Sequence, residues 1–234
     1  MAVEVVPGVY DISLTFVHAF LVAADDGLTL IDSGIPKREQ KFLGLVRELK
    51  MQPSDVRSIV LTHHHGDHMG SLAALKGATQ ATIYAHPEDV PYIRGDRPQP
   101  GPNRNGLGNQ IMATFMGRMA GQKPDFVQVD SEVTDGQELP VAGGLRVIHT
   151  PGHTPGHIAL LQQSKRVLFA GDAAANLFGL RPPPSIFTAD TEQAKQSLRR
   201  LAELEFDVAC FGHGSVLKGA AHRRFRRLVE KMAR

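Results

Sequence analysis

Four side chains of types that commonly bind metal ions occur within one six-residue stretch of this chain. They belong to the segment Thr62-His-His-His-Gly-Asp-His68. Neutral imidazole and carboxylate groups are the ligands expected for zinc and related divalent metals. The apolar run Ser58–Thr62 in front of them is typical of a buried strand, so a turn anchored at one end can bring the side chains together. The pattern predicts a metal site that includes His63, His65, Asp67 and His68.

Three later segments each place one further ligand-type residue beside a glycine at the end of a predicted strand. They are Thr150-Pro-Gly-His153, Ala170-Gly-Asp172 and Phe211-Gly-His-Gly214. Glycine lets a backbone approach a ligand closely, because it has no side chain to clash. With the first cluster these segments supply seven ligand-type residues, a number that suits two adjacent divalent ions. Zinc is the first expectation, and the same ligands also suit iron or manganese.

The motifs resemble those of the metallo-β-lactamase-fold superfamily, over a span from about Val9 to Gly214. The resemblance implies an α+β fold, an αββα sandwich of two mixed β-sheets flanked by helices. It implies that His63, His65 and His153 hold the first metal. It further implies that Asp67, His68 and His213 hold the second, and that Asp172 bridges the two. The matching motifs are Leu30-Ile-Asp-Ser-Gly34, the His63–His68 cluster, Pro151-Gly-His-Thr-Pro-Gly-His157, Gly171-Asp172 and Gly212-His-Gly214.

Differences between branches of that superfamily narrow the expected activity. The β-lactamases lack the bridging aspartate present here as Asp172, and flavodiiron proteins usually carry glutamate where His65 stands. The histidine cluster resembles that of glyoxalase II, but the stretch after His213 is too short for that enzyme's helical substrate domain. Homoserine-lactone lactonases commonly have a tyrosine at the position of Ala175. The broad, poorly defined hydrolase branch therefore fits best.

The expected reaction is hydrolysis of an ester, lactone or thioester of a small molecule by a hydroxide that bridges two metals. Two metals that share a water lower its pKa and make hydroxide available near neutral pH. Asp67 and Asp172 are the predicted catalytic residues, with Asp67 accepting and returning the proton. Two other functions remain open: a mononuclear iron persulfide dioxygenase, and a phosphodiesterase or nuclease.

Several residues near these motifs are expected to act indirectly or not at all. Asp32 ends a predicted strand and could orient a ligand histidine, as carboxylates behind metal ligands do. His157 is also expected to support the site, while His64 is expected to point away from it. Cys210 lies in an apolar run and is predicted to be a core residue.

Apolar segments outside the motifs are the predicted source of substrate selection. Residues 94–124 begin with a turn-rich stretch and continue into a methionine-rich run at 111–119, and together they could be a lid insertion. A second wall could come from the loop around Pro182-Pro-Pro184. Both favour a substrate with an apolar acyl group; the alternative is that they contact each other or a second subunit in a homodimer. The predicted substrate-binding residues are Met112, Phe115, Met116, Phe178 and Phe187.

Length and composition fit one globular domain over residues 1–234. The chain has 42% hydrophobic and 21% charged residues and a net charge of +2, which by itself indicates no partner. The run His222-Arg-Arg-Phe-Arg-Arg227 reads as the solvated face of a helix, so a nucleic-acid partner is not expected. No apolar run approaches the ~20 residues that cross a bilayer, and no signal segment is visible, so we expect a cytoplasmic protein.

Hydrophobic periodicity predicts strands and helices in both halves of the chain. A last helix is expected to carry Leu217, Ala221, Phe225, Leu228 and Met232 on one face. The other predicted helices cover 37–49, 70–75 and 191–204. Predicted strands are two within 9–24 and one each at 27–32, 58–62, 81–85, 126–129, 145–149, 158–161, 167–170 and 208–211.

Overall fold

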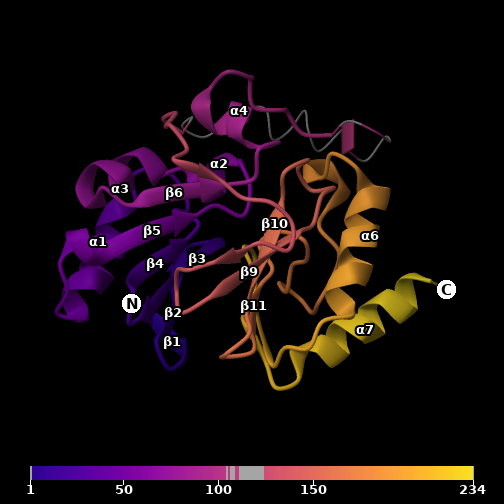
Figure 1. Ribbon diagram of the computed structural model, residues 1–234. Helices are drawn as coiled ribbons and strands as arrows, with labels where there is room; N and C mark the ends of the chain where they lie inside the picture. Colours follow the sequence, from indigo (N-terminus) through magenta and orange to yellow (C-terminus); the bar gives the residue numbers. More distant parts are fainter. Residues whose placement is uncertain (1, 104, 106–108, 111–123, 234) are drawn as a thin grey trace.

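The computed structural model describes residues 2–103, 105, 109–110 and 124–233. In these ranges two β-sheets lie face to face, and helices cover the outer face of each sheet (Figure 1). This is the αββα arrangement of an α+β protein that the resemblance implied. Each helix in the described ranges is too short or too polar to cross a membrane.

The first sheet is built from the N-terminal half of the chain. Its first four strands are antiparallel neighbours, and β4 to β7 then run parallel to one another. Its strands, in spatial order, are β1 (Val3–Val6), β2 (Val9–Leu14), β3 (Val17–Ala24), β4 (Gly27–Ile31), β5 (Val56–Val60), β6 (Thr82–Ala85) and β7 (Ser131–Glu132).

The second sheet comes from the C-terminal half and is also mixed. Only the β11–β12 pair is parallel among the strand pairs described there. Its spatial order is β13 (Leu217–Lys218), β12 (Val208–Cys210), β11 (Val167–Phe169), β10 (Ile158–Gln162), β9 (Leu145–His149) and β8 (Glu138–Leu139).

Alternation along the strands creates an apolar layer between the sheets and another on each outer face. In β3, Phe20 and Val22 contribute to the layer between the sheets, whereas Ala19 and Leu21 contribute to the layer beneath helices. This is the two-residue period of a strand that is buried on both faces. Phe20 meets Phe169 of the second sheet at a ring-centroid distance of 5.6 Å. The two halves of the chain therefore share one inter-sheet core.

Amphipathic helices close the two outer layers. In α1, Phe42, Leu45 and Val46 are buried against the first sheet. The side chain of Asp190 caps α6 by accepting a hydrogen bond from the Gln193 N–H. Figure 1 shows α1 and α3 on one side of the sandwich and α6 and α7 on the opposite side. The helices are α1 (Glu39–Glu48), α2 (Gly66–Met69), α3 (Leu72–Thr79), α4 (Val90–Arg94), α6 (Thr191–Ala202) and α7 (Ala221–Met232), with 3-10 turns η1 (Pro53–Asp55) and η2 (Ser185–Phe187).

The predicted metal ligands all follow strand ends that lie at one edge of the sandwich. The turn after β5 carries the histidine cluster, and the turn after β9 carries His153. Asp172 and His213 follow β11 and β12, which are parallel neighbours and so end at the same edge. The topology therefore brings ligand-type residues from both sheets together.

Two of the sequence-based expectations about secondary structure are wrong. Residues 126–129 form no strand, although Val127 and Val129 pack against the apolar layer between the first sheet and its helices. The first sheet is extended instead by the short strand β7. The last helix starts at Ala221, so Leu217 lies in β13 and not on the helix. Apolar spacing alone could not separate these cases, because Val127, Val129 and Leu217 are each at least partly buried whichever element they belong to. The other predicted elements are confirmed within a few residues at their ends.

We predict that Phe225→Ala lowers the free energy of unfolding by about 3–5 kcal/mol, the usual cost of emptying an aromatic core position. Phe225 is fully buried in α7, where its ring contacts Phe206 and stacks on Phe211. Urea unfolding followed by circular dichroism measures this loss. The exposed neighbour Arg224 is the matched control, because its replacement by alanine should change stability by no more than about 0.5 kcal/mol.

Candidate metal centre

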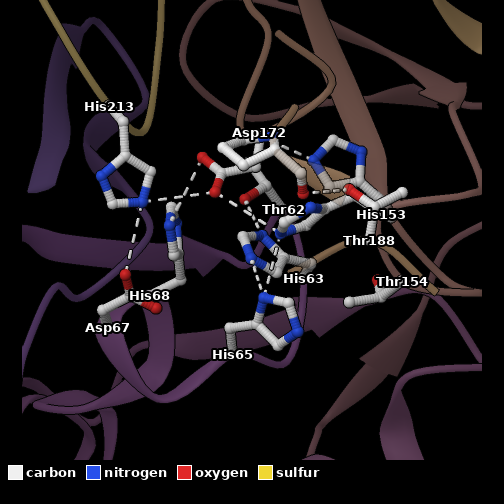
Figure 2. A network of polar contacts seen from close by, with 12 residues as sticks. Thr62, His63, His65, Asp67, His68, His153, Thr154, Asp172, Thr188 and His213 are labelled. Carbon is white, nitrogen blue, oxygen red and sulfur yellow. Dashed lines mark hydrogen bonds and ion pairs between the residues drawn. The ribbon is translucent and has the colours of Figure 1, made fainter. Parts of the chain in front are cut away.

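All seven side chains proposed as ligands converge at the edge of the sandwich (Figure 2). One group contains His63, His65 and His153, and a second contains Asp67, His68 and His213. Within each group the nitrogen and oxygen atoms that could bind an ion lie within 4.8 Å of one another. A third such group joins His63 and His68 to Asp172. The residues thus form two adjacent groups with a carboxylate in contact with both.

The first group has the geometry of three imidazoles around a common point. His65 Nδ1 lies 3.1 Å from His63 Nε2 and 2.9 Å from His153 Nε2. For zinc–nitrogen bonds of about 2.0–2.1 Å, tetrahedral geometry separates the nitrogens by about 3.3 Å. The observed separations are close to that value. A divalent cation fits this arrangement.

Asp172 connects the two groups through both carboxylate oxygens. Its Oδ2 atom lies 3.4 Å from His153 Nε2 and 3.3 Å from His213 Nε2. Its Oδ1 atom lies 3.5 Å from His68 Nε2. Asp67 Oδ2 completes the second group at 3.3 Å from His213 Nε2. One carboxylate therefore contacts histidines of both groups.

Hydrogen bonds on the outer side of three rings occupy their Nδ1 atoms and turn their Nε2 atoms towards the centre. His68 Nδ1 donates to Asp32 Oδ2 at 2.8 Å, and His213 Nδ1 donates to the Phe16 carbonyl at 2.8 Å. His63 Nδ1 lies 3.1 Å from Thr62 Oγ1, which itself donates to Asp32. The hydroxyl must then accept from His63, because its own proton is already engaged. Each Nε2 atom faces the centre, as metal binding requires.

Asp32 organises this outer layer from the end of β4. Its carboxylate accepts from the Thr62 N–H at 2.7 Å, from the Thr62 hydroxyl at 2.8 Å and from His68. The residue is buried and adopts a left-handed backbone conformation with φ of 62°. That conformation is costly for a residue other than glycine, and aspartate tolerates it better than most. Through these contacts Asp32 would be able to orient the His68 ring, which stays a prediction.

His157 supports the backbone next to Asp172. Its Nε2 accepts a hydrogen bond from the Asp172 N–H at 2.9 Å, so its proton is on Nδ1 and is donated to Thr150 Oγ1 at 2.7 Å. His157 is therefore neutral and fully buried. With one nitrogen accepting from the backbone and the other donating to a hydroxyl, it has a supporting position and not a ligand position.

Buried polar atoms without partners lie at the centre of the site. They are His68 Nε2 and Asp172 Oδ1, which face each other. Leaving a buried polar atom unpaired costs about 1–3 kcal/mol, so such atoms require an explanation. A divalent cation between His68 and Asp172 would satisfy both atoms. The donor set and its unpaired atoms thus fit a divalent metal.

The electrostatics of the two groups differ. Burial, together with the other imidazoles nearby, holds the pKa of His63 and His65 well below the usual value. Burial likewise lowers the pKa of His153 to about 3, although Asp172 opposes the shift. These rings are therefore neutral at neutral pH, the form in which imidazole binds metals.

In the second group the carboxylates dominate. Burial alone would lower the pKa of His68 and of His213, but Asp172 and neighbouring carboxylates raise these values to about 9 and about 11. Both rings therefore carry a proton on Nε2 at neutral pH in the metal-free protein, and a bound metal would displace that proton. Burial would raise the pKa of Asp67, yet its contact with His213 lowers it to about 2. The carboxylates are thus ionised at neutral pH, as metal ligands must be.

Sequence reasoning missed Asp89, which hydrogen-bonds to both histidine-bearing loops. Its position in His86-Pro-Glu-Asp89 carries no motif, so only the fold reveals it. It also missed Phe16, whose ring is parallel to that of His213 at a centroid distance of 6.3 Å. His64 points away from the metal groups as expected: it stacks on Tyr92 and donates from Nδ1 to Gln99.

The residues predicted to bind substrate are only partly described. Met112, Phe115 and Met116, with the rest of 111–123, lie outside the described residues. Phe178 and Phe187 lie in the loop between β11 and α6, and 86% and 40% of their surfaces are exposed. Both are on the surface, as a substrate wall requires.

A fourth cluster of possible ligands, His86, Glu88 and His149, has a less suitable geometry. The two rings are stacked with centroids 4.0 Å apart and an angle of 11° between planes. Lone pairs in the planes of stacked rings point side by side and not at one atom. His149 Nε2 also donates to the Pro155 carbonyl. We assign no metal to this cluster.

Comparison with known proteins identifies the family. The family model of the metallo-beta-lactamase superfamily matches residues 12–213. The chain belongs to this superfamily. It is 27% identical to the probable metallo-hydrolase YflN of Bacillus subtilis, over 92% of this chain and 87% of that protein. It is 28% identical to the hydroxyacylglutathione hydrolase GloC of Haemophilus influenzae, over 73% of this chain and 74% of that protein.

Solved structures of the superfamily share the fold. A metallo-beta-lactamase family protein of Thermus thermophilus, TTHA1429, superposes with a TM-score of 0.72 at 25% identity, covering 98% of this chain and 81% of that one. The subclass B3 metallo-beta-lactamase BJP-1 of Bradyrhizobium japonicum gives a TM-score of 0.71 at 20% identity, and the match covers 99% of this chain and 92% of that one. Together with the clustered ligand-type residues, the family makes this chain a metal-dependent hydrolase.

We predict that acidification destabilises the fold in part through His86. Burial and the adjacent imidazole of His149 lower the pKa of His86 from 6.5 to about 4. The unfolded chain takes up this proton at higher pH than the folded protein, so stability falls as the pH drops from 6.5 towards 4. Urea unfolding of wild type and His86→Asn over that range should show a shallower fall in the variant. An unchanged slope contradicts the assignment.

Proposed function

We propose that this chain is a dinuclear metal-dependent hydrolase that cleaves an ester, lactone or thioester. The observation that carries the proposal is the position of Asp172, whose two oxygens contact histidines of both ligand groups. A carboxylate placed in this way suits a bridging ligand between two ions. A site for one ion would need only one of the two groups.

The proposed ligands of the first ion are His63 Nε2, His65 Nδ1 and His153 Nε2, the three atoms that converge. Asp67, His68 and His213 would hold the second ion, and Asp172 would contact both. When bound, two divalent ions supply an activated water near neutral pH and polarise the substrate carbonyl. Zinc is the proposed metal because histidine and carboxylate ligands suit it, as they also suit iron and manganese.

Among the chain's own residues, Asp67 is proposed to move the proton. Its carboxylate is ionised, lies at the rim of the site and contacts His213 through Oδ2. It can accept a proton from the attacking water and return it to the leaving alkoxide or thiolate. Asp172 contributes differently: its backbone N–H is fixed by His157 and its carboxylate lies between the groups.

Exposed apolar side chains beside His213 support a substrate with an apolar portion. Phe16, which is 54% exposed, stacks on the His213 ring and accepts its Nδ1–H through the backbone carbonyl. Leu177, which is 57% exposed, follows Asn176, whose N–H donates to the His213 carbonyl. Phe178 and Phe187 extend the exposed apolar surface of the same loop. The name of the Haemophilus relative GloC supports a thioester within this class.

We predict that His65→Ala and Asp172→Ala lose bound metal and esterase activity together. Each removes a proposed ligand, and Asp172 serves both groups, so its variant should lose both ions. Elemental analysis and hydrolysis of a panel of carboxylic esters, lactones and thioesters measure the two effects. Asp130→Asn, at an exposed ion pair with Lys76, is the matched carboxylate control and should keep both properties. Full turnover by a folded Asp172→Ala protein contradicts the proposal.

Elemental analysis, with a persulfide and a phosphodiester added to the substrate panel, tests the other reaction classes. One iron per chain with oxygen consumption on a persulfide would replace the proposal with a dioxygenase. Faster turnover of a phosphodiester than of any carboxylic ester would replace it with a phosphodiesterase.

We predict that Phe16→Ala raises KM for long-chain acyl esters by roughly tenfold and changes kcat less. Loss of a partly buried aromatic contact costs on the order of 1–2 kcal/mol of binding shared by substrate and transition state. Steady-state kinetics on short and long acyl esters separates the two constants. Phe16→Leu should restore most of the affinity, and Val3→Ala, in β1, should have no effect. Equal KM values for Phe16→Ala and wild type contradict a substrate contact.

A further inference from the structure

A buried carboxylate outside the ligand set joins the two loops that hold the first metal group. Asp89 immediately precedes α4 and is 1% exposed. Its Oδ2 accepts from the His64 N–H at 3.0 Å and from the Thr154 hydroxyl at 2.7 Å. Its Oδ1 accepts from the Gly156 N–H at 2.7 Å. All three donors come from segments that carry proposed ligands.

Two of the donors are adjacent in sequence to histidines of the first group, and the third lies three residues from one. His64 lies between His63 and His65 in the turn after β5 of the first sheet. Thr154 follows His153 in the turn between β9 and β10 of the second sheet, and Gly156 lies two residues further along. A single carboxylate thus fixes the separation between two loops that come from different sheets. His63, His65 and His153 can converge only if that separation is right.

The contacts suit a side chain that accepts hydrogen bonds at both of its outer atoms. An N–H, an O–H and another N–H all point at the side chain, so every position calls for an acceptor. A carboxylate accepts at all of them, whereas an amide must direct its NH2 group at one of the donors. Burial raises the pKa of Asp89, and the contacts with His64, Thr154 and Gly156 oppose that shift. A buried carboxylate is costly, but the amide of an asparagine at position 89 would not accept from the same three donors.

The loop at Gly156 approaches Asp89 so closely that no side chain can be accommodated at position 156. A Cβ atom on Gly156 would lie 2.6 Å from the Asp89 nitrogen and 2.7 Å from its Oδ1. Separations that short do not occur between real atoms of these types, so glycine is needed for the loop to reach the carboxylate. The contact between the loop and Asp89 leaves no room for an intervening residue or water at that point.

We propose that Asp89 is a positioning residue that sets the geometry of the His63, His65 and His153 group by locking the two loops together. This inference rests on the proposed metal site, because it assigns to Asp89 the placement of the two loops that carry the first group of ligands. Groups that hold metal-binding loops in place usually change metal affinity 10–100-fold when they are removed.

The test measures Co²⁺ binding to the first group alone. His213→Ala, which removes a ligand from the second group only, serves as the parent protein, and Co²⁺ is titrated into the metal-free protein by visible absorbance. Asp89→Asn and Thr154→Val are added to this parent. We expect both to weaken Co²⁺ binding, Asp89→Asn by about 10–100-fold and Thr154→Val by less, and to alter the ligand-field bands. Thr154→Ser keeps the hydroxyl and should restore the parent affinity.

A matched variant separates positioning from general loss of stability. Val46→Ala empties a core site in α1, far from both loops, and its melting temperature is measured in the metal-free protein beside that of Asp89→Asn. We expect Val46→Ala to lower the melting temperature without changing Co²⁺ affinity. Parent-like affinity in Asp89→Asn, or an equal loss in Val46→Ala, overturns the inference while leaving the metal site intact. A parent protein that binds no Co²⁺ overturns the proposed metal site itself, and the inference with it.

Discussion

The inter-sheet core is the constraint on which the site depends. Four of the seven proposed ligands follow a strand of the first sheet and three follow strands of the second. Contacts such as that between Phe20 and Phe169 fix the distance between the sheets. Atoms that must lie about 3 Å apart to share an ion tolerate little movement of one sheet against the other. Packing far from the metals therefore determines whether their ligands meet.

Polar groups that hydrogen-bond to the proposed ligands, or to the loops that carry them, fix the orientations of the ligand side chains. Asp32 sets the proton position on His68 and, through Thr62, on His63. His157 holds the backbone of Asp172, and Asp89 holds the two histidine loops. All three are buried and all three interact with more than one segment. Ligands, supporting groups and core form successive layers, and each layer restricts the movement of the next.

The sequence was most informative where chemistry and local structure coincide. The histidine cluster after an apolar run, and single ligands beside glycine at strand ends, predicted residues that the fold does bring together. Asp89 and Phe16 could not be predicted, because their roles depend on neighbours distant in sequence and on no local pattern. The strand expected at 126–129 was wrong for a related reason: apolar alternation reports burial, and Val127 is half-buried without being in a strand. The residues that line a substrate site likewise depend on which segments the fold brings side by side, and a local sequence pattern does not reveal them.

The order of the ligands along the chain has a consequence for biosynthesis. His63, His65, Asp67 and His68 leave the ribosome well before His153, Asp172 and His213, since domains are made from the N-terminus onwards. The first group can be completed once the turn after β9 supplies His153, whereas the second group lacks His213 until β12 has been made and added beside β11. Metal acquisition by the nascent chain would therefore finish only after β12, which makes a fully loaded centre a sign that the parallel β11–β12 pair of the second sheet has formed.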